Sequence, residues 1–163
     1  HVTFAHPVCS ELGDIIEASC REVGVKTHRG GTYVCMEGPA FSTKAESNVY
    51  RQWGMDIIGM TNLQEAKLAR EAEIAYATLA LVTDYDCWYE GHDDVTVDMV
   101  IEYLNKNVRN AQLVLKDAVK AVAAKTTPNQ YAGAIKNAIF TAPANWPEAT
   151  AIKLEAIIGK YNV

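Results

Sequence analysis

Residues 74–83 read IAYATLALVT, a nearly unbroken apolar run that ends abruptly in the polar sequence Asp84-Tyr85-Asp86. A run of this length is typical of a strand that is buried on both faces, as in sheets that helices cover on both sides. We therefore expect residues 74–83 to form a central strand of a mixed or parallel sheet.

Shorter strand and helix patterns alternate on both sides of this run. The sequence predicts strands at residues 32–36 and 56–60, and helices at residues 10–23, 43–53, 63–72, 96–123, 130–140 and 147–158. Ser10 is expected to cap the first helix, while Gly24 and Gly54 are expected to end the first two helices. Strands that alternate with helices indicate an α/β fold.

The composition is that of a globular chain. Of its 163 residues 49% are hydrophobic and 21% charged, and the formal net charge is −5. A chain this apolar is not expected to be disordered. Nucleic acid is not an expected partner, because phosphate binding requires clustered cations. A membrane partner is not expected either, since no apolar stretch approaches the ~20 residues of a span.

The cysteines and histidines do not show the spacing of metal ligands. The 4 cysteines are far apart, without a C-x-x-C pair, so no metal site is predicted. They are typical of small buried residues in a reducing cytoplasm. The sequence His92-Asp93-Asp94 could suggest metal ligands, but an exposed acidic turn is the favoured interpretation.

Chemistry-bearing side chains follow each predicted strand, in residues 37–42 (EGPAFS), 59–61 (GMT) and 83–86 (TDYD). Working residues gather at strand ends in helix-covered sheets, so these segments are the candidate site. Two carboxylates one residue apart repel each other, and partial burial raises the pKa of one of them. The alternative is that Asp84 and Asp86 cap the following loop and helix.

The other two segments are ambiguous when each is taken alone. A hydroxyl at a helix start, such as Thr61, serves more often as a cap than as an anion ligand. Phe41, by itself, is expected to be a core residue.

Taken together, the ordered motifs E-G-P-x-F-S, G-M-T and T-D-Y-D-C-W resemble the trimeric purine nucleoside phosphorylase family, and within it the methylthioadenosine-specific members. The resemblance runs over about residues 1–123 and is most specific over residues 33–100; residues 45–47 (AES) and 62–65 (NLQE) fit it too. It implies a three-layer α/β/α fold with a mixed central sheet. The chain is expected to be the C-terminal part of a single nucleoside phosphorylase domain, lacking the N-terminal strands.

The resemblance assigns the acids to the purine. Asp84 matches the acid that addresses N7 and the exocyclic amine, and Asp86 matches the acid that supports it. A protonated carboxyl donates to N7 while its other oxygen accepts from a 6-amino group, whereas Asn suits a 6-oxo group. Asp84 therefore points to adenine.

The resemblance also assigns the sugar and phosphate contacts. Phe41 matches the ring that packs on the base, Met60 the residue against the ribose, and Thr61 the hydroxyl that binds phosphate. His1 matches a histidine that reaches the sugar in a neighbouring subunit. The implied assembly is a homotrimer, which can pair into a hexamer, with sites shared between subunits.

Substrate preference is assigned to Ser42 and Val97, where the family selects a methylthio group over a 5′-hydroxyl, and Val100 is expected to line the same pocket. An apolar side chain at Val97 leaves a hydroxyl without a partner, a penalty of roughly 1–3 kcal/mol.

The implied reaction is phosphorolysis of 5′-methylthioadenosine to adenine and 5-methylthioribose-1-phosphate, a step of purine and methionine salvage, in the cytoplasm. Inorganic phosphate is the co-substrate and no cofactor is expected. The alternatives are a purine nucleoside phosphorylase of other specificity, a phosphate-independent nucleosidase, and a nucleoside-binding remnant without activity.

The sequence departs from the family pattern at two motif positions. Ala40 stands where relatives usually carry Arg, and Gly59 where Asn is common. The family's glycine-rich phosphate loop and its Arg-His phosphate ligands belong to a segment ahead of the part matched by His1. We therefore expect a companion N-terminal segment.

Overall fold

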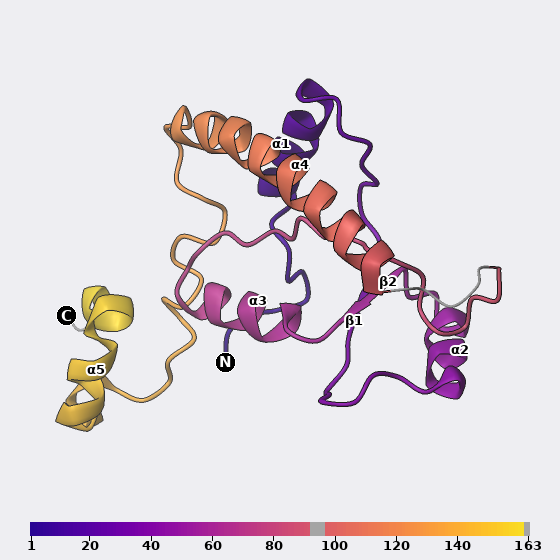
Figure 1. Ribbon diagram of the computed structural model, residues 1–163. Helices are drawn as coiled ribbons and strands as arrows, with labels where there is room; N and C mark the ends of the chain where they lie inside the picture. Colours follow the sequence, from indigo (N-terminus) through magenta and orange to yellow (C-terminus); the bar gives the residue numbers. More distant parts are fainter. Residues whose placement is uncertain (92–96, 162–163) are drawn as a thin grey trace.

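The computed structural model describes residues 1–91 and 97–161. Figure 1 shows helices around a small sheet. The elements are α1 (Ser10–Glu22), β1 (Tyr33–Cys35), α2 (Lys44–Gln52), β2 (Ile57–Gly59), α3 (Asn62–Glu71), α4 (Val97–Ala123) and α5 (Glu148–Ile158), with short 3-10 turns at Pro143–Asn145 and Gly159–Tyr161. The predicted α/β class is confirmed. None of the helices described is long and apolar enough to cross a membrane.

β1 and β2 pair in parallel, joined by α2, and this unit positions the candidate site. Tyr33 lies opposite Ile57. The pairing extends past both strands, because the Asp56 amide donates to the Thr32 carbonyl at 2.9 Å and the Met36 amide donates to the Gly59 carbonyl at 2.8 Å. The carboxyl ends of both strands therefore open at the same edge.

The prediction of a central strand over residues 74–83 is wrong. No strand is assigned there, and no side chain in the run is fully buried. Ile74 and Val82 are each 58% exposed. A strand requires neighbours that bond its backbone, and in residues 1–91 and 97–161 β1 and β2 pair only with each other. The segment is held instead by single bonds, such as that from Asn107 Nδ2 to the Val82 carbonyl at 2.8 Å.

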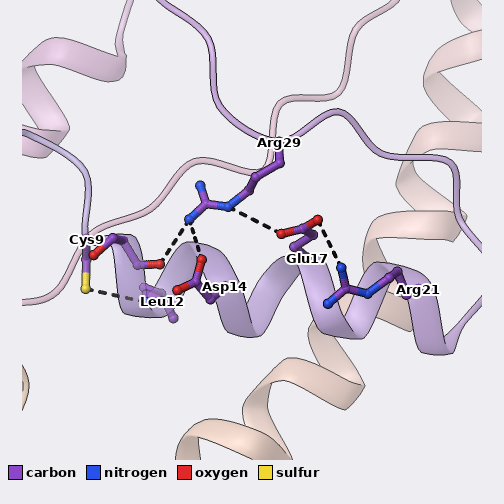
Figure 2. Close-up of polar contacts among 7 residues, drawn as sticks. Cys9, Leu12, Asp14, Glu17, Arg21 and Arg29 are labelled. Atoms are coloured by element: carbon purple, nitrogen blue, oxygen red, sulfur yellow. Dashed lines mark hydrogen bonds and ion pairs between the residues drawn. The ribbon is translucent and has the colours of Figure 1, made fainter.

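The predicted cap of the first helix is also wrong by one position. Ser10 is the first helical residue, and Cys9 is the N-cap, its Sγ accepting from the Leu12 amide at 3.5 Å (Figure 2). The predicted ends are confirmed, since Gly24 and Gly54 take positive φ angles directly after the C-cap residues of α1 and α2.

Arg29 fastens the segment after α1 back onto that helix. Its Nη2 donates to the Ser10 carbonyl at 3.1 Å and to Asp14 Oδ1 at 2.8 Å, and its Nε lies 3.6 Å from Glu17 Oε2 (Figure 2). The guanidinium occupies the space beside Gly13, where a Cβ would lie 2.6 Å from it.

The main helix packing is that of α1 against α4. Small residues make the close approach possible: Ser19 and Cys20 of α1 and Ala118 of α4 are buried, together with Val114. An ion pair between Lys125 and Glu11 joins the end of α4 to the start of α1.

The predicted helix over residues 130–140 is wrong, whereas the helices predicted around α2, α3, α4 and α5 are confirmed; residue 96, the predicted start of the α4 helix, lies outside the described residues. Residues 130–138 form successive turns, with Gly133 at φ +86°. The Ile135 amide donates to Glu73 Oε1 at 2.9 Å instead of to a helical carbonyl. A tertiary contact thus takes the donor that a helix would need.

Glu73 is the centre of this contact. It follows α3 at φ +59°, a position that glycine usually fills, and its side chain is only 3% exposed. Burial raises the pKa of Glu73, but bonds from Lys160, the Ile135 amide and Tyr161 outweigh burial and lower the pKa to about 2. The Glu73 carboxylate therefore holds residues 133–135 and 160–161 against α3.

This network predicts an acid-labile contribution to stability. Because the folded pKa of Glu73 lies below its ordinary 4.5, the contribution is complete above about pH 4.5 and declines as pH falls toward 2. Urea unfolding should therefore show a steeper loss of stability over this window in the wild type than in Glu73→Gln. Glu102→Gln, which removes an exposed carboxylate of α4, should leave the slope unchanged. Equal slopes in all three proteins would contradict this role of Glu73.

Candidate active site

The segments that were predicted to form the site contact one another directly. Met60 lies against Gly38, because a Cβ on Gly38 would be 1.9 Å from Met60 Cε. The Cys87 thiol donates to the Ser42 carbonyl at 3.5 Å. Residues 36–43 therefore touch both residue 60 and residue 87, and form the middle of the site.

Asp86 is fixed by α2 and by its own turn. The buried Ser47 hydroxyl donates to Asp86 Oδ2 at 2.5 Å, and the Cys87 amide donates to Asp86 Oδ1 at 2.8 Å. The Tyr89 amide also donates to the Asp86 carbonyl at 3.0 Å. Asp86 thus organises the turn, as the capping alternative predicted, and both of its oxygens are engaged.

Asp84 is placed differently. Its side chain is exposed, and in the described part of the chain its one hydrogen-bond donor is Thr83 Oγ1, at 2.7 Å from Oδ1. The carboxylate therefore keeps Oδ2 open to a ligand. Asp84 can accept from an amine, and its protonated form can donate to a ring nitrogen.

Thr61 is the N-cap residue of α3, but its side chain makes no capping bond. The hydroxyl is exposed at a helix N-terminus, where amide donors and the helix dipole favour an anion. The expectation that this hydroxyl would serve as an ordinary cap is not met.

Phe41 is not a core residue, since its side chain is 83% exposed. It lies beside Ser42, which is half-buried and whose hydroxyl donates to Met36 Sδ at 3.1 Å. Phe41 belongs to the segment that contacts Met60 and Cys87. Its exposed ring can stack on a planar ligand there.

The structure does not bring three of the predicted residues into this contact network. Val97 and Val100 lie in the first turn of α4, with Val97 73% exposed and Val100 half-buried. His1 lies against Phe140, with ring centroids 5.3 Å apart. Phe140 is itself 78% exposed, so His1 sits on the surface.

Gly59 and Ala40, where the sequence departs from the family pattern, have different surroundings in the structure. The Tyr33 hydroxyl fills the space beside Gly59, where a Cβ would lie 1.7 Å from it. Burial raises the pKa of Tyr33, as do the nearby Cys35 and Glu65. Ala40 is exposed.

Sequence reasoning missed the side chains of α2 that hold the Asp84–Asp86 turn. Besides Ser47, Arg51 places its guanidinium 3.6 Å from the centroid of the Trp88 ring. The signal available was the spacing of polar residues along α2, which places residues 44, 47 and 51 on one face.

In residues 1–91 and 97–161, no group of three or more His, Cys, Asp or Glu side chains is arranged to hold a metal ion. The sequence His92-Asp93-Asp94 lies outside these residues.

The parallel β-α-β unit presents Phe41, Ser42 and Thr61 after its two strands, and the turn that carries Asp84 and Asp86 contacts it through Cys87. The chain belongs to the phosphorylase superfamily, whose family model matches residues 1–120.

Its relatives carry a more specific name. S-methyl-5'-thioadenosine phosphorylases from Gloeobacter violaceus and Thermosynechococcus vestitus are 54% and 55% identical to it over 99% of this chain. The chain spans about half the length of these relatives, 55% and 57%.

Solved structures of methylthioadenosine phosphorylases are also similar to this chain. A methylthioadenosine phosphorylase from an antarctic soil metagenomic library superposes with a TM-score of 0.87 at 45% identity, over 96% of this chain and 56% of that one. The methylthioadenosine phosphorylase from Schistosoma mansoni in complex with adenine matches with a TM-score of 0.70 at 34% identity, over 77% of this chain and 49% of that one.

The contact between Gly38 and the terminal methyl of Met60 predicts that a side chain at residue 38 displaces Met60. Gly38→Ala should destabilise the protein by about 1–2 kcal/mol, mostly because Gly38 has φ +68° and in smaller part because Met60 must move. Gly30→Ala is the matched control, since Gly30 has φ +86° with nothing within 4 Å. Thermal unfolding should show the larger loss for Gly38→Ala. An equal loss in both variants would show that backbone strain alone is responsible.

Proposed function

We propose that this chain carries the base- and sugar-binding part of an enzyme that phosphorolyses 5′-methylthioadenosine. The observation that carries the proposal is the open carboxylate of Asp84 in the turn that Ser47 holds through Asp86, a turn that contacts the segment of Phe41 through Cys87 and Ser42. The names of the relatives support the same substrate.

In the proposed reaction, phosphate attacks C1′ of the ribosyl group as the bond to adenine N9 breaks. The bonding electrons leave with the purine, and a proton from the Asp84 carboxyl reaches N7, so that neutral adenine departs. The other product is 5-methylthioribose-1-phosphate. Asp84 recognises the 6-amino group, and Asp86, held by Ser47, fixes the turn that carries it. A donor placed where charge develops is often the largest single contribution to catalysis.

The remaining residues take the roles that the sequence predicts. Phe41 packs on the purine, Met60 contacts the ribose, and Thr61 binds phosphate with the free hydroxyl at the start of α3. Ser42, Val97 and Val100 select the methylthio group, and His1 serves the site of a neighbouring subunit. Inorganic phosphate is the co-substrate, and no cofactor takes part.

We further propose that the working enzyme contains a companion N-terminal segment and is a homotrimer or a pair of trimers. The support is the exposed apolar stripe along α4, formed at spacings of three, four and seven by Val97, Ile101, Leu104, Val108, Leu115, Val119 and Val122. An uncovered stripe of this length is typical of a face that packs against further polypeptide. The expected compartment is the cytoplasm, which agrees with the free thiols of all 4 cysteines.

The first test concerns the reaction. The protein is purified with every polypeptide that accompanies it, and adenine release from methylthioadenosine is measured with and without phosphate. Release that requires phosphate is expected. Release without phosphate would identify a nucleosidase, and adenine binding without release would identify a nucleoside-binding protein. Mass spectrometry of the same active sample should reveal the companion segment.

The second test concerns Asp84. Asp84→Ala should lower kcat/KM for methylthioadenosine by about 10²–10³, as for other deleted transition-state donors. Asp84→Asn should shift preference toward inosine or guanosine, because an amide suits a 6-oxo group. Asp98→Asn, on the exposed side of α4, is the control and should keep normal turnover. An Asp84→Ala protein with more than half of the wild-type turnover would refute the assigned role.

A further inference from the structure

One face of α2 holds the turn that carries the acidic residues. Lys44, Ser47 and Arg51 are spaced three and four residues apart, so they project from the same side of the helix. Each contacts a different residue of the turn: Lys44 pairs with Glu90, Ser47 donates to Asp86, and Arg51 lies over Trp88. We call these three side chains of α2 the clamp.

The helix that carries the clamp, α2, is capped at both ends. Thr43 and Glu46 form a reciprocal capping box, in which the Thr43 amide donates to Glu46 Oε2 at 2.7 Å and the Glu46 amide donates to Thr43 Oγ1 at 3.3 Å. Gly54 ends the helix at φ +75°. Because a capping box begins α2 and a glycine ends it, the helix that carries the clamp has a fixed backbone.

The three contacts are unequal. The pair of Lys44 and Glu90 is exposed on both sides, so it contributes little. The bond from Ser47 holds Asp86, which in turn accepts from the Cys87 and Tyr89 amides. Of the three clamp residues, Arg51 is the one that contacts the rings of the turn, because its guanidinium lies 3.6 Å from the centroid of the Trp88 ring, well inside the ~6 Å range of a cation–π interaction.

Trp88 passes this restraint to the whole turn through ring contacts. Its ring meets Tyr85 edge-on at 5.9 Å and Tyr89 edge-on at 5.3 Å, while Tyr85 and Tyr89 stack at 4.3 Å. Tyr85 is the neighbour of Asp84 in the chain. A ring cluster fixed by Arg51 therefore limits the backbone movement of Asp84, whose own side chain has few restraints.

We propose that Arg51 is a positioning residue for Asp84: through the face of Trp88 it fixes the 84–90 turn, and so the distance of the Asp84 carboxyl from the purine. This inference rests on the proposed function, because it gives the clamp the task of adenine recognition. Arg51 itself touches no reacting atom.

The test compares Arg51→Gln, Arg51→Lys and the control Arg109→Gln, which removes an equally exposed arginine from α4. Hydrogen exchange of the amides of residues 84–90 is measured in the purified protein with its accompanying polypeptides. Arg51→Gln should accelerate exchange there by roughly 2- to 5-fold, the factor that corresponds to a cation–π contact of an exposed arginine. Arg51→Lys, which keeps a cation over the ring, should recover part of the protection, and Arg109→Gln should change nothing.

Affinity separates a positioning role from a merely structural one. Calorimetric titration with adenine and with hypoxanthine gives the ratio of the two affinities, which global loosening does not alter. Arg51→Gln should lower the ratio of adenine to hypoxanthine affinity by a similar factor of roughly 2- to 5-fold. If exchange rises but the ratio is unchanged, the clamp does not serve Asp84 and the proposal is overturned.

A double-variant cycle guards against a simple folding defect. Trp88→Leu removes the same contact from the other side, so the Arg51→Gln and Trp88→Leu pair should together accelerate exchange no more than Trp88→Leu alone. Additive effects would overturn the proposal. If the wild type binds neither base, the proposed function fails and the role of Arg51 in adenine recognition fails with it, while faster exchange would still establish the clamp.

Discussion

The site depends on a short parallel pairing between β1 and β2. This pairing places the residues that follow each strand at one edge of the sheet, where Gly38 meets Met60. The helix between the two strands then faces the 84–90 turn and bonds to it through Ser47. Backbone hydrogen bonds of a three-residue ladder thus determine which side chains from distant parts of the sequence can act together.

Two buried charged groups fasten the remaining segments to α3. Arg70, 5% exposed, donates to the carbonyls of Thr3 and His6 at 2.6 Å each, and its guanidinium lies 3.7 Å from the centroid of the Tyr131 ring. Glu73 accepts from donors near the C-terminal end. Burial of a charge is costly unless it is well bonded, so both arrangements resist small displacements. The segments on either side of α3 are consequently placed by polar rather than apolar contacts.

The sequence predicted best what local chemistry determines. Gly24 and Gly54 end helices as expected. The prediction of a helix over residues 130–140 failed because a distant group, the Glu73 carboxylate, accepts the hydrogen bond of the Ile135 amide. The prediction of a strand over residues 74–83 also failed, since an apolar run specifies burial but supplies no neighbouring strand.

The candidate site was also predicted only in part. The rule that site residues follow strands grouped Met60 with residues 37–42, and these segments touch. The 84–90 turn also touches them through Cys87, although no strand precedes it. The spacing of Lys44, Ser47 and Arg51 shows that they share one face of α2, but it does not determine which segment that face meets. The family resemblance supplied residue roles that composition and periodicity could not.

The close fit of Tyr33 over Gly59 links two positions that lie on neighbouring strands. Because the phenol occupies the volume that any larger residue at 59 would need, a larger residue at 59 conflicts with Tyr33 unless the phenol moves. A shorter side chain at 33 would remove the conflict and leave room for a polar group at 59. Homologous proteins with a larger residue at 59 should therefore carry a smaller or displaced residue at 33, and a design that enlarges residue 59 should change the two positions together.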